Sequence, residues 1–153
     1  MTEKTNLAIR LLQEMDYSRG IDLLEEVLAE EPENEMALYN IGLAYNCTDK
    51  PENAIKTFNY YLKNFDPNPN VLAGLGFSYY LTGDLEKAKT TLEQAVALDG
   101  DNVYALLNFG GVLAELGETD KAKNTFHTIL QLSPNDSKAL TGMGVLLFNE
   151  ENF

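Results

Sequence analysis

The sequence predicts an all-α fold built from a repeated pair of antiparallel helices. Within the stretch 37–45, four residues lie at the spacing of one face of an α-helix: Leu38, Ile41, Gly42 and Tyr45. Related residues return every 34 positions, as Leu72, Leu75, Gly76 and Tyr79, then Leu106, Phe109, Gly110 and Leu113, then Leu140, Met143, Gly144 and Leu147. A constant period of this kind is typical of a repeat solenoid, in which each unit buries surface only against its neighbours.

A second set of columns marks the other helix of each unit. A small residue comes first, a large apolar residue follows four positions later, and a further residue, mostly apolar, lies three positions beyond. The three columns are Gly20, Ala54, Ala88 and Ala122; Leu24, Phe58, Leu92 and Phe126; and Val27, Tyr61, Ala95 and Ile129. This spacing is again helical, so each unit is predicted to hold two helices.

Local signals set the ends of these helices. Pro32 ends one helix because the residue before a proline disfavours helix, and Pro51 stands in a first turn, where proline is favoured. Gly83 and Gly117 lie in corresponding turns, and Asp136 with Ser137 forms a helix cap. We expect helices over about residues 3–14, 19–30, 35–47, 51–64, 70–81, 85–98, 103–116, 119–132 and 137–149.

These helices predict one continuous domain over residues 1–153. Its repeats span about 1–34, 35–68, 69–102 and 103–136, with a half repeat at 137–153. The stretch 66–70 is the richest in turn-forming residues and has the composition of a linker between domains. Because the period continues across it, we interpret this stretch as a turn between repeats.

These columns resemble the tetratricopeptide repeat, whose pattern has a large apolar residue, then Leu-Gly, an aromatic residue, and later Ala, a large apolar residue and Pro. The usual tryptophan is leucine here, and the first unit has Lys4 and Ala8 at two core positions. Terminal repeats are commonly atypical because one side faces water. The resemblance implies a right-handed superhelix whose concave side is lined by the first helix of each pair.

Composition argues against several classes of function. The net charge of −13 disfavours nucleic acid, which requires clustered Lys and Arg. There is one cysteine, Cys47, so no internal disulfide is expected and a reducing compartment fits. The N-terminus has no apolar signal segment, and no run is long enough to span a bilayer. We therefore expect a cytoplasmic protein without membrane insertion.

The sequence offers no recognisable catalytic or metal-binding constellation. His127 is the only histidine and has no Cys or Ser partner at an informative spacing. Gly42 and its counterparts lie inside helices, where packing explains them better than phosphate binding does. We expect no enzyme activity, no cofactor and no metal.

Two surfaces are candidates for binding a protein partner. An acidic cluster, Glu25, Glu26, Glu30, Glu31, Glu33 and Glu35, is either a docking site for a basic partner or a solvated outer face, and the second interpretation is favoured. The other surface is the concave side that the resemblance implies. Its peptide-binding residues would be Tyr39, Asn40, Leu43, Asn46, Ala73, Phe77, Tyr80, Tyr104, Leu107 and Asn108.

The resemblance also suggests how a peptide would be held. Some families of this repeat hold an extended peptide through an asparagine ladder, which Asn40 and Asn108 match by position, since an amide both donates and accepts hydrogen bonds. Another branch grips a C-terminal carboxylate with Lys and Asn. The matching positions here are Thr5, Ile9 and Ala73, which disfavours that mode.

The leading hypothesis is a non-catalytic scaffold that binds an apolar or aromatic peptide, extended or helical, with basic flanks. The alternatives are self-assembly into a homo-oligomer and an accessory segment of a larger protein. Self-assembly would use the last helix, where Leu140, Met143, Leu147 and Phe148 have no following helix to bury them.

Overall fold

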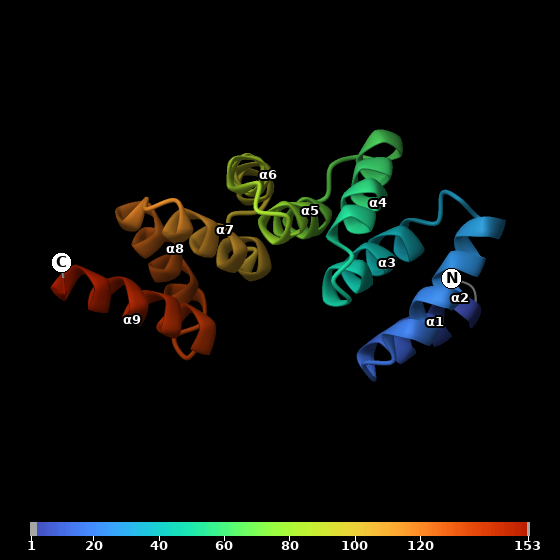
Figure 1. Cartoon of the computed structure of the whole chain (residues 1–153), viewed down its shortest axis with the longest axis horizontal. Helices are drawn as coiled ribbons and strands as arrows, with labels where there is room; N and C mark the ends of the chain where they lie inside the picture. Colours follow the sequence, from blue (N-terminus) through green and yellow to red (C-terminus); the bar gives the residue numbers. More distant parts are fainter. Residues whose placement is uncertain (1–2, 153) are drawn as a thin grey trace. The chain divides into compact units, whose positions relative to one another are not determined.

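The computed structural model describes residues 3–152, and its helix ends lie within two residues of the predicted positions. Figure 1 shows the helices joined in chain order by short turns. In the described range every regular element is an α-helix: α1 (Glu3–Gln13), α2 (Tyr17–Glu30), α3 (Glu35–Cys47), α4 (Pro51–Asn64), α5 (Pro69–Leu81), α6 (Leu85–Leu98), α7 (Val103–Glu115), α8 (Thr119–Leu132) and α9 (Ser137–Glu151). Over the same residues, no helix has the length and apolar character needed to cross a membrane.

Polar side chains begin the first helices of the repeats at the same register. Asn34 accepts a hydrogen bond from the backbone N–H of Ala37 at 3.0 Å and caps α3. Asn102 caps α7 in the same way, and Asp136 caps α9 at 2.9 Å, as the sequence predicts. These caps satisfy N–H groups that have no partner inside the helix.

The turn inside each helix pair repeats a left-handed backbone conformation. Gly83 and Gly117 have φ angles of 83° and 75°, which confirms the expectation that these glycines serve a special turn. Met15 and Asp49 stand in the same column and have φ angles of 62° and 57° without being glycine. The turn geometry is therefore common to the four helix pairs, although the residue type is not.

Glycines in the first helices receive the large apolar residue of the second helix. A Cβ atom added at Gly42 would lie 2.6 Å from the ring of Phe58, and one at Gly76 would lie 2.5 Å from Leu92. Each of these two partners is fully buried. The 34-residue period therefore reflects one packing contact that recurs in successive repeats.

The chain divides into two compact units, Met1–Pro67 and Asn68–Phe153. In the first unit α2 packs on α1 and α3, and α3 packs on α4. In the second unit each helix packs on the next one, and α7 also contacts α5 and α9. The boundary falls inside the turn-rich stretch 66–70, so the prediction of a single array over residues 1–153 remains a prediction.

Candidate functional site

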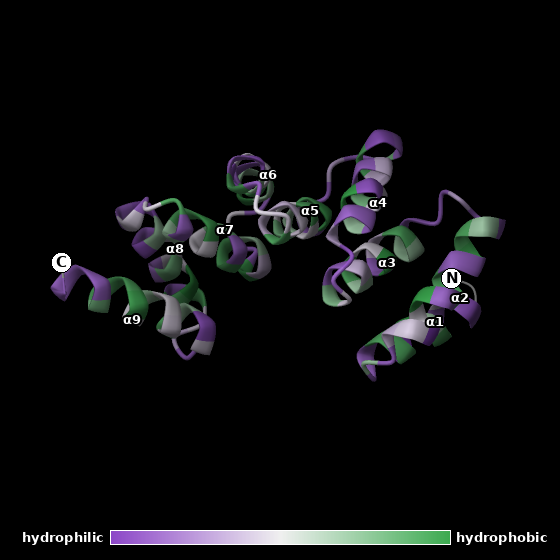
Figure 2. Cartoon of the chain, viewed as in Figure 1, coloured by the Kyte–Doolittle hydropathy of each residue, from purple (hydrophilic) through white to green (hydrophobic). Residues whose placement is uncertain are grey.

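Helices α5 and α7 are neighbours in the second unit and are almost free of charge. Glu115 is the only charged residue in the two sequences. Several side chains on these helices are nevertheless only partly buried, and we call five of them the α5–α7 face: Phe77, Tyr80, Tyr104, Leu107 and Asn108. Figure 2 shows α5 with little of the hydrophilic colour that marks much of α6.

Two aromatic rings lie together on this face. The ring centroids of Phe77 and Tyr80 are 6.1 Å apart and the ring planes differ by 17°, which is an offset stack. Leu81 follows them and is exposed. Because the rings are only half-buried, they retain apolar surface that a ligand can cover.

The neighbouring positions on α7 are small. Gly111 and Ala114 stand one repeat after Phe77 and Tyr80, in the same two columns. A Cβ atom added at Gly111 would have no heavy atom within 4 Å, so the space in front of this residue is open. Large rings on α5 therefore stand beside small residues on α7, which leaves room for an apolar side chain of a ligand.

Leu107 contributes to this surface and to the interior. It packs against the core of the second unit, which includes Leu106, Leu113 and Phe126. Its position is therefore set by core packing while part of the side chain stays accessible.

The side chains of Asn40 and Asn108 do not form a row of free amides. The Asn40 side-chain nitrogen donates to the carbonyl of Met36 at 2.8 Å, within its own helix. The Asn108 side-chain nitrogen is buried and has no hydrogen-bond partner within residues 3–152. An unpaired buried amide is costly, and a backbone carbonyl of a ligand would satisfy it if the side chain turned outward. The asparagine ladder remains a prediction.

In the first unit, the corresponding surface lies on α3. Tyr39 and Leu43 are half-buried and Met36 is exposed. Burial raises the pKa of Tyr39 above its ordinary value. Two residues expected on the surface lie inside instead. Ala73 is fully buried and Asn46 is nearly so, because the positions face neighbouring helices, so neither side chain is available to a ligand.

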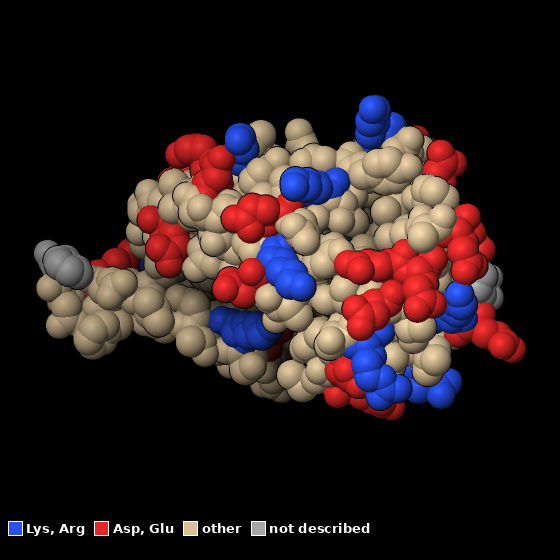
Figure 3. Space-filling model, turned by 45° about the vertical axis from the view of Figure 1, so that its right-hand side comes forward, with Lys and Arg blue, Asp and Glu red and all other residues tan. Residues whose placement is uncertain are grey.

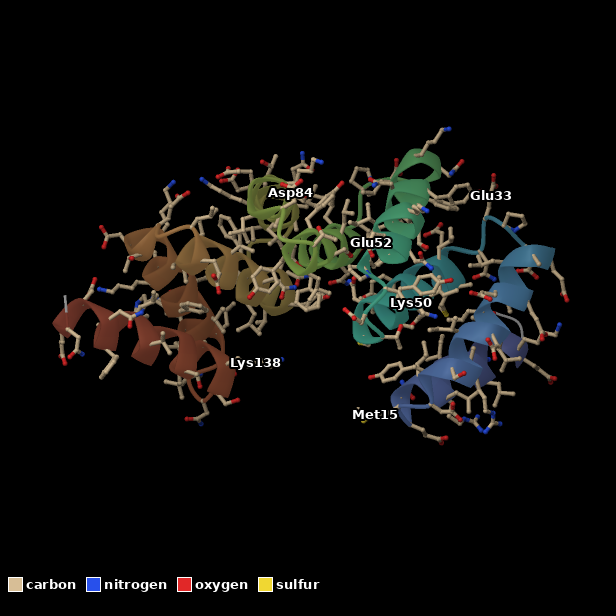
Figure 4. All side chains as sticks on the ribbon, in the orientation of Figure 1. Met15, Glu33, Lys50, Glu52, Asp84 and Lys138 are labelled. Atoms are coloured by element: carbon tan, nitrogen blue, oxygen red, sulfur yellow. The ribbon has the colours of Figure 1, made fainter. Side chains whose placement is uncertain are left out.

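Charge is concentrated on the second helices and on the turns. Helix α2 alone holds Arg19, Asp22 and three glutamates, and Figure 3 shows acidic groups outnumbering basic ones on the visible face. A shallow depression in the turn between α2 and α3 is lined by Glu31, Pro32, Glu33 and Asn34, and Figure 4 labels Glu33 there. An open depression lined by solvated carboxylates fits the solvated-face interpretation.

Several members of the acidic cluster have structural contacts. Glu25 accepts a hydrogen bond from the Tyr45 hydroxyl at 2.8 Å, and burial together with this contact raises the pKa of Tyr45 to about 12. Glu35 accepts one from the Tyr61 hydroxyl at 3.0 Å. Glu30 pairs with Lys4 at 2.9 Å. These contacts tie α2 to α1 and α3, and α3 to α4.

The groups that metal or nucleophilic chemistry would need are scattered. His127 is exposed on α8, and Cys47 is an exposed thiol at the end of α3. Within the part of the chain that the structure describes, no three His, Cys, Asp or Glu side chains gather where they could hold a metal ion.

Helix α9 keeps exposed apolar residues on two sides. Leu140, Leu147 and Phe148 are exposed, as expected, and so is Val145. Met143 differs from the expectation because it packs against the core of the second unit and is half-buried. By register, Val145 and Phe148 continue the columns of Gly111 and Ala114 on the α5–α7 face, because α9 is the next first helix.

Comparison with known proteins agrees with this architecture. Family models described as tetratricopeptide repeat match residues 5–69 and 81–146. Among curated proteins, no sequence matches this chain. A TPR protein of Thermus thermophilus, TTC0263, superposes with a TM-score of 0.84 at 21% identity, over 96% of this chain and 81% of that one. PilF of Pseudomonas aeruginosa does so with a TM-score of 0.85 at 22% identity, over 97% and 68%.

A third structure was solved with a bound peptide. It is the second TPR domain of human RPAP3 in complex with the HSP70 peptide SGPTIEEVD. That domain is 26% identical, with a TM-score of 0.66 over 71% of this chain and 91% of that domain. The helix pairs, their period and the matching family models together show that this chain is an all-α helical solenoid belonging to the tetratricopeptide repeat family.

Proposed function

We propose that this protein is a non-catalytic scaffold that binds a peptide segment with apolar or aromatic side chains on the α5–α7 face. The observation that carries the proposal is the contrast between the almost uncharged composition of α5 and α7 and the partial exposure of their large side chains. Two adjacent helices with a single charged residue leave Phe77, Tyr80, Tyr104 and Leu107 partly exposed. Contiguous apolar surface of this kind usually marks a site of interaction.

The comparison with RPAP3 supports a peptide as the ligand class. That related domain was solved with an HSP70 peptide, SGPTIEEVD, so helix pairs of this family bind peptide segments. The acidic peptide itself is a poor candidate here, because this chain carries a net charge of −13. A peptide with Lys or Arg beside its apolar residues would be attracted instead.

Residues on α3 offer a second, separate contact surface of the same kind. Tyr39 and Leu43 are half-buried, and Asn40 lies beside them with its amide nitrogen bonded inside the helix. We propose these three residues as a separate contact surface of the first unit, and we leave out Asn46 and Ala73, whose side chains are buried.

Self-assembly is the weaker candidate function. The exposed apolar residues of α9 favour it, but two copies with a charge of −13 each would repel one another. Light scattering over a concentration series tests it, since a monomer at all concentrations excludes assembly.

Selection from a displayed library of random peptides tests the proposed function. The intact protein should enrich peptides with aromatic or aliphatic residues and basic flanks. The double variant Phe77→Ala, Tyr80→Ala should lose this enrichment while circular dichroism shows the same helix content. The matched control is Leu98→Ala, which removes an exposed apolar side chain from the second helix α6. Equal enrichment by the double variant and the intact protein would refute the proposal.

A further inference from the structure

Helices α5 and α7 lie side by side and run in the same direction. At their N-terminal ends, the side-chain nitrogen of Asn102 donates a hydrogen bond to the side-chain oxygen of Asn70 at 2.7 Å. At their C-terminal ends, the last residues are Leu81 and Glu115, which are one repeat apart. Residues 34 positions apart therefore occupy equivalent places along the two helices.

The C-terminal halves of the two helices differ at three equivalent positions. On α5 these positions hold Phe77, Tyr80 and Leu81. On α7 they hold Gly111, Ala114 and Glu115. The stacked rings of α5 therefore stand next to two small residues and a carboxylate, and the space in front of Gly111 is open.

The carboxylate of Glu115 has no cation to neutralise it. Glu115 is exposed, and no ion pair within residues 3–152 involves it. Its place in the last turn of α7 is unfavourable, because the C-terminal end of a helix carries a partial negative charge. Glu30 and Glu150 also lie in last turns, of α2 and α9, and each pairs with a lysine. A ligand that brings a positive charge to Glu115 would relieve this repulsion.

An internal contact of this chain indicates how a cation can use both a ring and a carboxylate. The side-chain nitrogen of Lys87 lies over the Tyr79 ring, 5.6 Å from its centre. The same nitrogen is 3.2 Å from an oxygen of Asp84, which is labelled in Figure 4. On the α5–α7 face, Tyr80 supplies a ring and Glu115 a carboxylate, but no basic residue of α5 or α7 joins them.

We propose that the peptide bound on the α5–α7 face places an arginine side chain across Gly111 and Ala114, with its guanidinium group paired to Glu115. This inference rests on the proposed function, because it assigns one residue of that ligand. Gly111 and Glu115 are four residues apart, about 6 Å along the helix, which an extended arginine side chain spans. Its aliphatic stem can cover apolar surface while the charged head reaches the carboxylate.

The geometry favours arginine over lysine. A guanidinium group is planar, so it can stack on the ring of Tyr80 and bind a carboxylate through two parallel hydrogen bonds. An ammonium group acts as a point charge and can do neither. The basic residue of the ligand is therefore expected at one fixed distance in sequence from the residue that packs on Phe77 and Tyr80.

Selection from a displayed library of random peptides tests the arginine position. The intact protein should enrich arginine at one fixed position relative to the aromatic or aliphatic residue. Glu115→Gln should lower this enrichment about three- to tenfold and still select apolar residues. Glu115→Lys should select Asp or Glu there. Both variants should stay helical by circular dichroism, because Glu115 is exposed and a cation is favourable at a helix C-terminus.

Glu151→Gln is the matched control. It removes the same charge from the last turn of another first helix, α9, at an exposed residue outside the three positions. The enrichment of arginine should therefore be unchanged. Gly111→Leu is an independent variant that places a side chain where the arginine stem would lie, and it should also lower the enrichment. Its Cβ atom meets no heavy atom within 4 Å.

The outcomes separate this inference from the proposed function. Apolar enrichment by the intact protein without a fixed arginine would overturn the inference alone. An apolar residue selected at that position would do the same, since the space at Gly111 would then hold an apolar side chain. Equal arginine enrichment by Glu115→Gln and the intact protein would also overturn it. No enrichment of any kind by the intact protein would refute the proposed function, and the inference with it.

Discussion

At the scale of single residues, the fold depends on glycines against which an aromatic ring packs. The Phe126 ring lies between Gly110 and Gly142, because a Cβ atom at Gly142 would be 2.6 Å from its Cζ atom. The ring therefore has no free side into which it can move when Gly110 is enlarged.

The pair Gly110→Ala and Gly144→Ala tests this contact. Gly110→Ala should lower the free energy of unfolding by about 1–3 kcal/mol through overpacking against Phe126. Gly144→Ala adds the same methyl where nothing is in contact and should raise it by about 0.5–1 kcal/mol through helix propensity. Urea denaturation measures both values, and equal stability of the two variants would contradict the packing described.

The turn residue Met15 offers a second test at this scale. Its φ angle of 62° is unfavourable for a side chain with a Cβ atom, and the side chain is 72% exposed, so it contributes little packing (Figure 4). Met15→Gly should raise the free energy of unfolding by about 0.5–1 kcal/mol, because the relieved strain exceeds the added entropy of glycine. The reverse change Gly83→Ala should lower it, and the opposite order of stabilities would contradict this assignment.

At the scale of helices, buried tyrosines and ion pairs connect successive repeats. The Tyr45 hydroxyl on α3 donates to Glu25 on α2, and its pKa is raised to about 12, first by burial and then by this contact. A raised pKa means that the folded state holds the proton more tightly. The stabilisation is therefore complete below the ordinary value of 10.0 and is lost as pH rises through about 12.

Tyr45→Phe should remove this alkaline dependence. Titration by the ultraviolet absorbance of tyrosinate should lose its highest-pH component in the variant, because the other shifted tyrosines keep their own environments. An unchanged titration curve would show that Tyr45 does not titrate near pH 12 and would contradict the assignment.

The pKa of Glu118 is shifted in the opposite direction from that of Tyr45, so its effect on stability falls on the acid side. Hydrogen bonds from Lys121 at 2.7 Å and from Lys89 at 2.5 Å lower the pKa of this carboxyl below its ordinary value of 4.5. The stabilisation is present above pH 4.5 and is lost as pH falls through the lowered pKa. Glu118→Gln should therefore flatten the acid side of a plot of melting temperature against pH, and an unaltered acid slope would contradict the role of this link between α6 and α8.

Helix positions were the part of the structure that sequence reasoning predicted best. Apolar residues at helical spacing recur every 34 positions and leave little freedom for where each helix ends. The observed ends of α3, α4 and α6 are the predicted ones. Side-chain exposure was less predictable. Ala73 shares a column with Leu107, yet its short side chain is fully covered while part of Leu107 stays accessible. Column position alone does not specify how far a side chain reaches beyond its neighbours.

The hydrogen bonding of the Asn40 side chain could not be predicted for a similar reason. Its column suggests an amide that faces a ligand, but a local hydrogen bond to the carbonyl of Met36 is also open to it. Such side-chain to backbone contacts depend on the rotamer, which the sequence pattern does not encode.

At the scale of the whole molecule, the dominant property is a large negative charge from which α5 and α7 are nearly free. Asp and Glu side chains number 24 against 11 Lys and Arg. We therefore expect the nearly uncharged helices α5 and α7 to contact a ligand. The charged second helices would attract it over longer distances.

Salt dependence of binding tests this division. For peptides that carry basic flanks and are selected by the protein, added salt should slow association, because screening weakens attraction between solvent-exposed charges. Stopped-flow mixing measures the association rate at increasing salt. The dissociation rate should change little, since apolar contacts hold the bound state. A salt-independent association rate would contradict electrostatic attraction as a contribution.

The most direct test of the account is to locate a selected peptide on the ¹⁵N-labelled protein by nuclear magnetic resonance. We predict that the amide resonances that shift on titration belong to α5 and α7 and include Phe77, Tyr80 and Leu107, while resonances of α6 and α8 outside the contacts with these helices stay in place. Shifts confined to the second helices or to the acidic turn between α2 and α3 would contradict the account.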